Sequence, residues 1–478
     1  MKKAGLFFAF YILHLALWAQ TVTQKLQKAY QQFETDSQLK HALVSLYVIN
    51  AKTGEVVFDK NSQIGLAPAS TQKIISAATA FELLGKDYRY KTDLRYDGKV
   101  ENGVLRGNLY FVGYGDPTLG SWRYKNANEN AIFAEFEEPI LTRKIKGIDG
   151  FTIPISENWE TQTTPNGWIW QDIGNYYGAG ASAINWRENQ FDVQLESSNK
   201  VGTDVSIAGT TPELVEVSLT SELKSGEENS GDNAYIYLPP LASEGIIRGT
   251  IPINEHSFKI SGSLPDPSKQ FVYSFLKDLS VRMPGSSFIL KSIDDITHEK
   301  RPASGVQGHV NLNNMASLHA HYSPSLDSII YWFLQKSINL YGEALIKTFA
   351  YEKKGFGATD TGIVIVKDFW KQKGVDESEL NIYDGSGLSP LNRVTTHAQV
   401  EILKYAKQQS WFSYFFNALP EYNNMKMKSG SISDVKSFCG YHTTGDGTQY
   451  IFSFIVNNYN GSSPGVVKKM YRVLDNLK

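Results

Sequence analysis

Apolar and polar positions along the chain predict a strand pair followed by a buried helix. Residues 43–49 and 55–58 are apolar runs joined by a short turn, a pattern typical of a β-hairpin. Residues 74–84 form an Ala-rich, almost wholly apolar run that follows Pro68 and ends at Gly85. Proline near the start and glycine just past the end mark a helix. Its apolar body predicts burial on most sides.

From about residue 88 the pattern changes to short strands with tight turns. Tyr90, Leu94 and their neighbours at every second position alternate with polar residues, and turn dipeptides such as Asp97-Gly98 follow. A second β-rich stretch follows the most polar segment, residues 221–233, which we expect to be an exposed loop. The middle of the chain is therefore predicted to be mainly β-sheet.

Helices return near residue 320. Ser323-Pro324 supplies an N-cap and a proline for a helix that runs towards Asn339. Residues 438–441 and 450–456 are predicted strands joined by a turn. The chain ends in a helix with one apolar stripe, which we expect to pack on the sheet. The order of elements predicts one α/β domain interrupted by another.

Helices are expected at both ends of this arrangement. A polar helical stretch covers roughly residues 20–36, and the stripe of the last helix contains Val466, Met470, Leu474 and Leu477. The predicted fold class is therefore α/β (α+β), with helices around an antiparallel sheet and a β-rich insertion of one or two small domains.

Composition places the chain among ordinary globular proteins. It has 478 residues, of which 41% are hydrophobic and 20% charged, and a formal net charge of −2. This usage excludes disordered, collagen-like and multi-pass membrane proteins, and the charge gives no general attraction to nucleic acid. Cys439 is the only cysteine, so neither a disulfide nor a Cys-based metal site is expected. The His319/His321 pair has no neighbouring ligand cluster in the sequence, and we predict no metal and no cofactor.

The first 19 residues have the pattern of a secretory signal. Lys2 and Lys3 precede an apolar stretch that ends near Leu17, and Ala19 is a suitable small residue for cleavage before Gln20. The sequence therefore predicts secretion across the inner membrane to the periplasm or cell envelope, without membrane association after cleavage. An uncleaved membrane anchor is the alternative.

Candidate chemistry begins with Ser70 and Lys73. A lysine three residues after a serine lies on the same helical face and can remove the serine proton. This spacing also begins at five other serines, but only Ser70 opens a buried helix, where the dipole and free N–H groups favour a nucleophile. The other serines with this spacing are Ser37, Ser197, Ser221, Ser274 and Ser433.

Two later motifs complete an ordered set with Ser70. Ser337-Ile338-Asn339 is expected to close the apolar helix, where both polar side chains reach a cleft. Lys428-Ser429-Gly430-Ser431 begins a run of strands and combines a positive charge, hydroxyl groups and a glycine that allows close approach. Similar triplets at Lys52 and Lys224 lie in a hairpin turn and in the charged loop, and the Ser156 copy also lies in a loop. We therefore reject those copies.

These motifs resemble those of the class C low-molecular-weight penicillin-binding proteins, which are serine D-alanyl-D-alanine carboxypeptidases and endopeptidases. Such enzymes carry Ser-x-x-Lys, Ser-x-Asn and Lys-Thr-Gly in this order along the chain. The resemblance covers residues 200–310 poorly. Further landmarks are Gly113-Tyr114-Gly115-Asp116-Pro117, Tyr177-Gly178-Ala179, Ser323-Pro324-Ser325-Leu326 and Asp384-Gly385-Ser386-Gly387-Leu388-Ser389.

The resemblance implies a discontinuous domain organisation. A signal peptide would cover 1–19, a serine DD-peptidase domain 20–88 plus 316–478, and inserted β-rich domains 89–315. The expected partners are peptidoglycan stem peptides and β-lactam antibiotics that acylate the serine. A β-lactamase and a catalytically silent cell-wall-binding protein of the same fold remain the alternatives.

The resemblance also implies a role for each site residue. Ser70 would attack the penultimate D-Ala carbonyl, and Lys73 would accept its proton. Ser337 would relay a proton to the leaving D-Ala amine, while Asn339 would hold the substrate backbone. The remaining motif would bind the terminal carboxylate through Lys428 and Ser429, with Gly430 beside the substrate and the N–H groups of Ser70 and Ser431 forming an oxyanion hole. Ser429 stands where the family usually has threonine.

Overall fold

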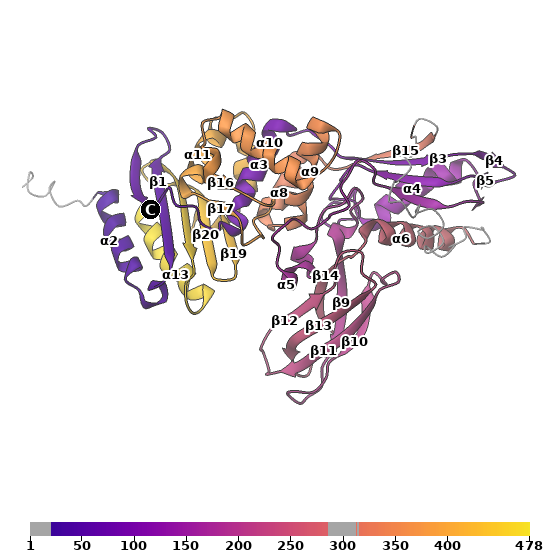
Figure 1. The fold of residues 1–478 in the computed structure, drawn as a ribbon, viewed down its shortest axis with the longest axis horizontal. Helices are drawn as coiled ribbons and strands as arrows, with labels where there is room; N and C mark the ends of the chain where they lie inside the picture. The colour runs from indigo at the N-terminus through magenta and orange to yellow at the C-terminus, as the bar shows by residue number, and fades with distance from the viewer. Residues whose placement is uncertain (1–20, 285–311, 313–314) are drawn as a thin grey trace, which may run out of the picture.

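The structure is a computed structural model that describes residues 21–284, 312 and 315–478. The predicted signal segment, residues 1–19, lies outside the described residues. Figure 1 shows a main body of helices and strands from which two β-rich extensions project. One extension contains α4 (Glu129–Thr142) and α6 (Pro267–Arg282), and the other contains strands β9 to β14.

The main body is built on a six-stranded antiparallel sheet in the order β18-β19-β20-β21-β1-β2. The first strand of the chain lies inside this sheet, because Leu43 pairs with Asn457 and Asn50 with Tyr450. The predicted hairpin is confirmed. The strands are β1 (Leu43–Asn50), β2 (Val56–Lys60), β18 (Glu421–Tyr422), β19 (Met425–Ile432), β20 (Val435–Thr443) and β21 (Gln449–Asn457).

Helices cover both faces of this sheet. On one face, α2 (Val22–Glu34) and α13 (Ser463–Leu474) share a core with the strands, and the predicted stripe of the last helix is buried in it. The packing of the C-terminal helix on the sheet is thus confirmed. The other face carries a larger core around α3 (Lys73–Leu83), the predicted Ala-rich helix. That core also contains α8 (Leu326–Gln335), α9 (Asn339–Lys354), α10 (Thr359–Gln372), α11 (Thr396–Lys407) and α12 (Phe412–Ala418).

Among residues 21–284 and 315–478, no helix combines the length and apolar character that crossing a membrane requires. The two described end segments, α2 and α13, pack against each other and against strands of the sheet through Leu26, Tyr30 and Val466.

The predicted helix from Ser323 to Asn339 is wrong at both ends. It begins at Leu326 with Ser325 as its N-cap, because the hydroxyl of Ser323 instead accepts a hydrogen bond from the Tyr90 backbone N–H at 2.9 Å. It ends at Gln335, and Asn339 begins the next helix, α9. The Ser-Ile-Asn motif therefore forms a link between two helices rather than the end of one.

The predicted loop over residues 221–233 is also partly wrong. Residues 218–226 form β11 (Ser218–Gly226), in which Leu223 and Ser225 are buried while their neighbours face outwards. This period-two burial stabilises a strand despite the charged sequence. Residues 227–232 alone connect β11 to β12 (Asn233–Tyr237).

The middle of the chain forms four small sheets, which confirms its predicted β-rich character. Their orders are β15-β3-β6-β8, β10-β9-β14, β11-β13-β12 and β4-β5-β7, and one core joins them to α4 and α6. The strands not yet bounded are β3 (Lys91–Tyr96), β4 (Lys99–Glu101), β5 (Val104–Arg106), β6 (Leu109–Gly113), β7 (Gly147–Ile148), β8 (Thr152–Ile155), β9 (Gln190–Glu196), β10 (Ser206–Thr211), β13 (Glu244–Pro252), β14 (Phe258–Ser263) and β15 (Ala316–Tyr322).

The strand β15 returns the chain from this region towards α8 and pairs antiparallel with β3. Its His319 and His321 both contact the carboxylate of Glu135 on α4, at 2.7 and 2.9 Å. These histidines therefore join the return strand to a helix of the middle region. The division of the chain into 20–88 plus 316–478 and 89–315 stays a prediction.

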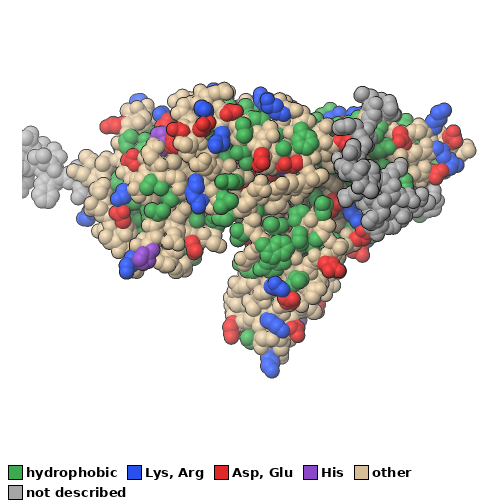
Figure 2. All heavy atoms as spheres, viewed as in Figure 1, with side chains coloured by type: hydrophobic (Ala, Val, Ile, Leu, Met, Phe, Trp, Pro, Cys, Tyr) green, Lys and Arg blue, Asp and Glu red, His purple; other side chains and the backbone are tan. Residues whose placement is uncertain are grey.

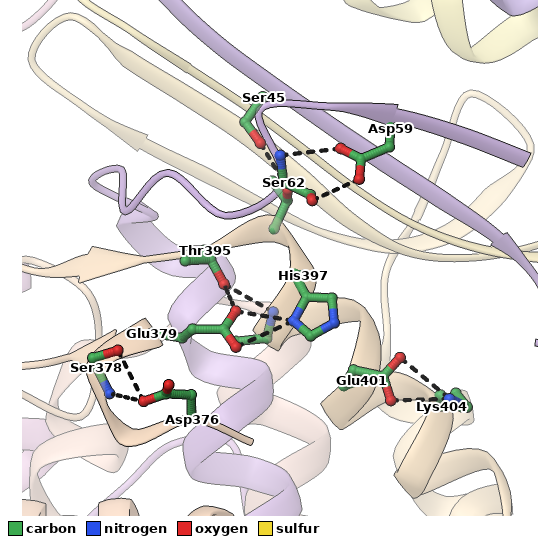
Figure 3. A network of polar contacts seen from close by, with 12 residues as sticks. Ser45, Asp59, Ser62, Asp376, Ser378, Glu379, Thr395, His397, Glu401 and Lys404 are labelled. Carbon is green, nitrogen blue, oxygen red and sulfur yellow. Dashed lines mark hydrogen bonds and ion pairs between the residues drawn. The ribbon is translucent and has the colours of Figure 1, made fainter. Parts of the chain in front are cut away.

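A polar network closes the base of the loop over residues 382–392 (Figure 3). The loop emerges from β16 (Leu380–Asn381) and returns through β17 (Arg393–Val394), which pair antiparallel. At this neck, the Glu379 carboxylate accepts a hydrogen bond from the Thr395 hydroxyl and contacts His397 Nδ1 at 3.0 Å. The contact raises the pKa of His397 and favours its charged form.

Candidate active site

Ser70 lies in a tight turn between the sheet and the buried helix α3. Residues 69–72 form a short 3-10 turn, η2 (Ala69–Gln72), that leads directly into α3 at Lys73. The turn is held to the sheet because the Pro68 carbonyl accepts hydrogen bonds from the hydroxyls of Thr71 (2.7 Å) and Ser437 (2.5 Å). Ala69 has a φ of 47°, an unusual conformation for a residue with a side chain. The residue before the serine is thus held in a strained backbone conformation.

Lys73 places its amine among three oxygen atoms. The amine Nζ lies 2.9 Å from Ser70 Oγ, 2.6 Å from Asn339 Oδ1 and 2.7 Å from the backbone carbonyl of Ser386. The amide and the carbonyl oxygens can only accept hydrogen bonds. A neutral amine has two N–H groups for these two acceptors, and its lone pair then faces the serine hydroxyl. The geometry therefore suits proton transfer from Ser70 to Lys73.

Burial favours the neutral form of that amine. The Lys73 side chain is fully buried, and loss of hydration together with the positive charge of Lys428 holds its pKa well below the usual lysine range. Asp384 and Glu343 oppose this shift with smaller effects. A lysine with a lowered pKa has the character of a general base near neutral pH.

The structure brings Asn339 into this cluster and orients its amide. Asn339 Nδ2 donates a hydrogen bond of 2.7 Å to the Tyr177 backbone carbonyl, which turns Oδ1 towards Lys73. Ser337 lies in the link before α9 with a φ of 57° and lines the same cavity as Ser70. The predicted grouping of Ser70, Lys73, Ser337 and Asn339 is therefore present in space.

The edge of β19 passes directly beside the serine turn. A Cβ atom added to Gly430 would lie 2.8 Å from Ser70 N and 2.7 Å from the Pro68 carbonyl oxygen, which explains glycine at this position. Ser431 is exposed and lines the cavity with Ser70. The strand thus brings the backbone after Gly430 close to the N–H of Ser70.

Lys428 lies deeper than the cavity wall. Its side chain is buried, its Nζ donates a hydrogen bond of 2.8 Å to the Ser429 carbonyl, and burial lowers its pKa to about 7. Cys439 pairs with Lys428 across the strands and is also buried, and burial raises the pKa of its thiol. Lys428, Ser429 and Gly430 are not among the residues that line the cavity with Ser70, but they directly precede Ser431, which does line it.

A buried aspartate organises the loop opposite the nucleophile. Asp384 accepts five hydrogen bonds, so both of its oxygens are fully engaged. Its Oδ1 atom accepts hydrogen bonds from Gln72 Nε2 (2.9 Å), Gly387 N (2.7 Å) and Asn392 Nδ2 (2.9 Å). Its Oδ2 atom accepts hydrogen bonds from Ser389 N (2.6 Å) and Trp168 Nε1 (2.9 Å). The loop delivers the Ser386 carbonyl to Lys73. The sequence identified Asp384 only as part of a landmark of the resemblance.

Glu343, to which the sequence assigned no role, supports the same loop from α9. Its carboxyl Oε2 accepts a hydrogen bond of 3.0 Å from Gly385 N, and its side chain is fully buried. Burial and the neighbouring Asp384 raise the pKa of Glu343 to about 8. Its spacing of four residues after Asn339, on the same helical face, was the available signal.

The cavity that contains Ser70 has a volume of about 470 Å³. It is lined from the main body by Ser70, Ser337, Asn339 and Ser431, and the middle region of the chain supplies a second wall. Residues of this second wall are Arg123, Ile169, Gln171, Asp172, Tyr176, Tyr177, Gln190 and Tyr235. Sequence reasoning did not identify Arg123 or Asp172, because their positions depend on how the insertion folds over the cleft.

The described residues contain no group of three or more histidine, cysteine, aspartate or glutamate side chains arranged to hold a metal ion. The chemistry of the site rests on a serine hydroxyl beside an amine base, with backbone N–H groups of η2 and β19 nearby. Such an arrangement performs acyl transfer through a covalent serine intermediate.

Comparison with protein families gives a match over almost the whole chain. Residues 24–477 match the family described as D-Ala-D-Ala carboxypeptidase 3 (S13). Among curated proteins, the chain is 24% identical over 463 residues to a D-alanyl-D-alanine carboxypeptidase of Actinomadura sp. (strain R39), covering 91% of this chain and 81% of that protein. It is 21% identical over 436 residues to D-alanyl-D-alanine carboxypeptidase DacB of Haemophilus influenzae, covering 86% and 84%.

The fold is similar to that of a solved penicillin-binding protein. The crystal structure of penicillin binding protein 4 (dacB) from Haemophilus influenzae matches with a TM-score of 0.75 and 19% identity, over 95% of this chain and 98% of that one. The same protein complexed with a β-lactam matches with a TM-score of 0.71, 19% identity, and coverage of 95% and 99%. The predicted fold class, helices around an antiparallel sheet with a β-rich insertion, is confirmed.

Proposed function

The chain belongs to the D-Ala-D-Ala carboxypeptidase 3 (S13) family of serine peptidases, and from this premise we propose that it hydrolyses peptidoglycan stem peptides ending in D-Ala-D-Ala through an acyl-enzyme on Ser70. The observation that supports this most directly is the position of Lys73 Nζ, 2.9 Å from Ser70 Oγ with its other two neighbours both acceptors. The fold likeness to penicillin binding protein 4 supports acylation by β-lactams as well.

Acylation begins with transfer of the Ser70 proton to the neutral amine of Lys73. The Oγ atom forms a bond to the penultimate D-Ala carbonyl carbon, and the N–H groups of Ser70 and Ser431 stabilise the negative oxygen. The C–N bond then breaks, and the proton held by Lys73 passes through the Ser337 hydroxyl to the departing D-Ala amine. In deacylation, Lys73 takes a proton from water, whose oxygen attacks the ester carbonyl carbon. The bond from that carbon to Ser70 Oγ then breaks, and Lys73 returns the proton to Oγ.

Asn339, Lys428 and Ser429 act in substrate binding in this proposal. The amide of Asn339 holds the substrate backbone, while Lys428 and the hydroxyl of Ser429 bind the terminal carboxylate with Gly430 allowing close approach. Because Ser429 keeps the hydroxyl that threonine supplies elsewhere in the family, we expect carboxylate binding to persist. We also propose export across the inner membrane to the periplasm or cell envelope, directed by residues 1–19.

The first test is intact-mass measurement after incubation with benzylpenicillin. We expect one covalent adduct that maps to Ser70 and persists, because deacylation is slow in a peptidase compared with a β-lactamase. Ser70→Ala should form none, whereas Ser37→Ala, a control with the same Ser-x-x-Lys spacing on an exposed turn, should react like the wild type. No adduct on folded protein favours the silent binder, and rapid turnover favours the β-lactamase.

The second test separates the base from the binding groups. Lys73→Ala should abolish acylation, whereas Lys428→Ala should mainly weaken substrate capture. Digestion of purified monomeric and cross-linked muropeptides then measures released D-Ala and split dimers. D-Ala release assigns carboxypeptidase activity and split dimers assign endopeptidase activity, and neither product from an acylation-competent protein would contradict the proposed hydrolysis.

A further inference from the structure

Exposed aromatic side chains gather beside the catalytic cavity on its second wall. Trp170 is 52% exposed, Tyr176 51% and Tyr235 36%. Tyr237 lies next to them, with its ring centroid 5.8 Å from that of Trp170. Figure 2 shows hydrophobic side chains gathered in this area, around α5 (Trp170–Ile173) and the adjoining strands. We call Trp170, Tyr176, Tyr235 and Tyr237 the aromatic patch.

The aromatic patch is continuous with the site of Ser70. Tyr176 and Tyr235 line the same cavity as Ser70 and Asn339. Tyr176 also contacts the ring of Tyr177 at 5.3 Å, and the Tyr177 carbonyl accepts the hydrogen bond that orients Asn339. A ligand that reaches from Ser70 along this wall therefore passes directly onto the patch.

The patch is held on a rigid support. The buried side chain of Asn175 bridges α5 and β12, because its Nδ2 donates to the Gln171 carbonyl at 2.7 Å and its Oδ1 accepts from Ile236 N at 3.1 Å. Gly174 allows this close packing, since an added Cβ would lie 2.1 Å from the Ile236 carbonyl oxygen. Aromatic rings fixed in this way bind without a large loss of side-chain freedom.

The chemistry of the patch suits a sugar ring. Gln171 and Asp172 line the same cavity as Tyr176 and Tyr235, and the guanidinium of Arg248, which is paired with Glu222, lies over the Tyr237 ring at 5.8 Å. A pyranose ring presents C–H groups on its faces and hydroxyl or acetamido groups at its edge, so it matches both features. Exposed apolar patches with a polar rim typically mark ligand-binding grooves.

We propose that the aromatic patch binds the amino-sugar strand to which the stem peptide is attached, so that the preferred substrate is a glycan-linked peptide rather than a free one. This inference rests on the proposed function. The scissile bond of a pentapeptide is separated from the sugar by four residues, about 13 Å of extended chain. A substrate with its D-Ala terminus at Ser70 therefore has its sugar well away from the reacting bond, and Tyr176 and Tyr235 of the patch line the cavity in which it lies.

The test compares two substrates with the same pentapeptide, one free and one attached to its disaccharide. D-Ala release gives kcat/KM for each. In Trp170→Ala we expect the ratio of glycan-linked to free kcat/KM to fall about tenfold, the effect of one lost stacking contact. Trp170→Phe should retain most of the ratio. Tyr322→Ala, which removes an exposed tyrosine of β15, should leave the ratio unchanged.

Equal losses for both substrates would show that the patch binds peptide, and an unchanged ratio in the folded Trp170→Ala variant would overturn the proposal. Calorimetric titration with a tetramer of N-acetylglucosamine measures sugar binding without catalysis. We expect binding to the wild type and at least about tenfold weaker binding to Trp170→Ala. If the wild type releases no D-Ala but binds the tetramer through Trp170, the proposed function fails and the sugar site stands. No binding to the wild type contradicts the sugar site.

Discussion

The indole N–H of Trp168 donates a hydrogen bond of 2.9 Å to Asp384 Oδ2, and the two residues are 216 positions apart in the chain. Both side chains are buried. The bond connects the segment that carries the second wall of the cavity to the loop that presents the Ser386 carbonyl to Lys73. The surroundings of the Lys73 amine therefore depend on a residue of the middle region of the chain.

Replacing Trp168 with phenylalanine should disturb the site as well as the fold. Trp168→Phe removes a donor from a buried carboxylate, and we expect a loss of about 2 kcal/mol in the free energy of unfolding. The loop should also become less ordered, so that benzylpenicillin acylates Ser70 more slowly. Urea denaturation and stopped-flow acylation measure the two effects. Trp370→Phe is the matched control, because it removes a buried indole bond to Thr79 Oγ1 and should cost stability without slowing acylation of the folded protein.

Gly387 should not tolerate a side chain. Its φ is +83°, and an added Cβ would lie 1.9 Å from the carbonyl oxygen of Ala69, the residue before the nucleophile. We expect Gly387→Ala to displace the serine turn and reduce the acylation rate by at least tenfold. Gly374→Ala introduces the same backbone strain at φ +91° with no atom within 4 Å, and should cost only about 1 kcal/mol of stability. Equal acylation rates in the two variants would argue against steric control at Gly387.

The charge of Lys428 should help determine the pH below which acylation of Ser70 becomes slow. Lys428 lowers the pKa of Lys73, so Lys428→Met should raise it. Acylation requires the neutral form of Lys73. As the pH is lowered, the acylation rate of Lys428→Met should therefore begin to fall at a higher pH than that of the wild type. The pH profile of kcat/KM for benzylpenicillin measures this shift. Lys426→Met is the control, since Lys426 lies on the same strand but is not among the charges that shift the pKa of Lys73 or of Lys428. An unshifted acid limb in Lys428→Met would contradict the electrostatic coupling.

Glu343 should make stability depend on pH. Its pKa rises from 4.5 to about 8 in the folded protein, so the folded state retains a proton that the unfolded state has lost. Stability then decreases as pH rises from 4.5 to about 8. Glu343→Gln removes the titration and keeps a neutral side chain of the same size. The unfolding free energy of the variant relative to the wild type should therefore increase with pH across this window. Parallel plots of unfolding free energy against pH for the two proteins would contradict the raised pKa of Glu343.

Much of the candidate site around Ser70 could be predicted because its signals are local. Ser70 and Lys73 are one helical turn apart, and the apolar run after them indicates a buried helix. The strand with Lys428 was also expected from its sequence. Asn339 lies beside Lys73 as the motif suggested, although the element predicted for it was wrong, because the motif depends on residue spacing and the helix end depends on tertiary contacts. Ser323, for example, caps the Tyr90 N–H rather than the helix.

The surrounding network could not be predicted in the same way. Asp384 obtains its donors from Gln72, Trp168 and its own loop, and only the folded chain brings these segments together. The strand over residues 218–226 was missed because its residues are polar, and pairing with β13 determines its structure. Long-range contacts thus decide the elements on which local propensity gives the wrong answer.

The position of β1 between β2 and β21 has a consequence for how the protein acquires its activity. Leu43 pairs with Asn457, so the first strand cannot complete the central sheet until nearly the whole chain is available. Contacts of such long sequence separation slow folding. A chain that is synthesised from its N-terminus first therefore holds Ser70 outside its final site until the last strands are in place, and activity that depends on this site begins only then.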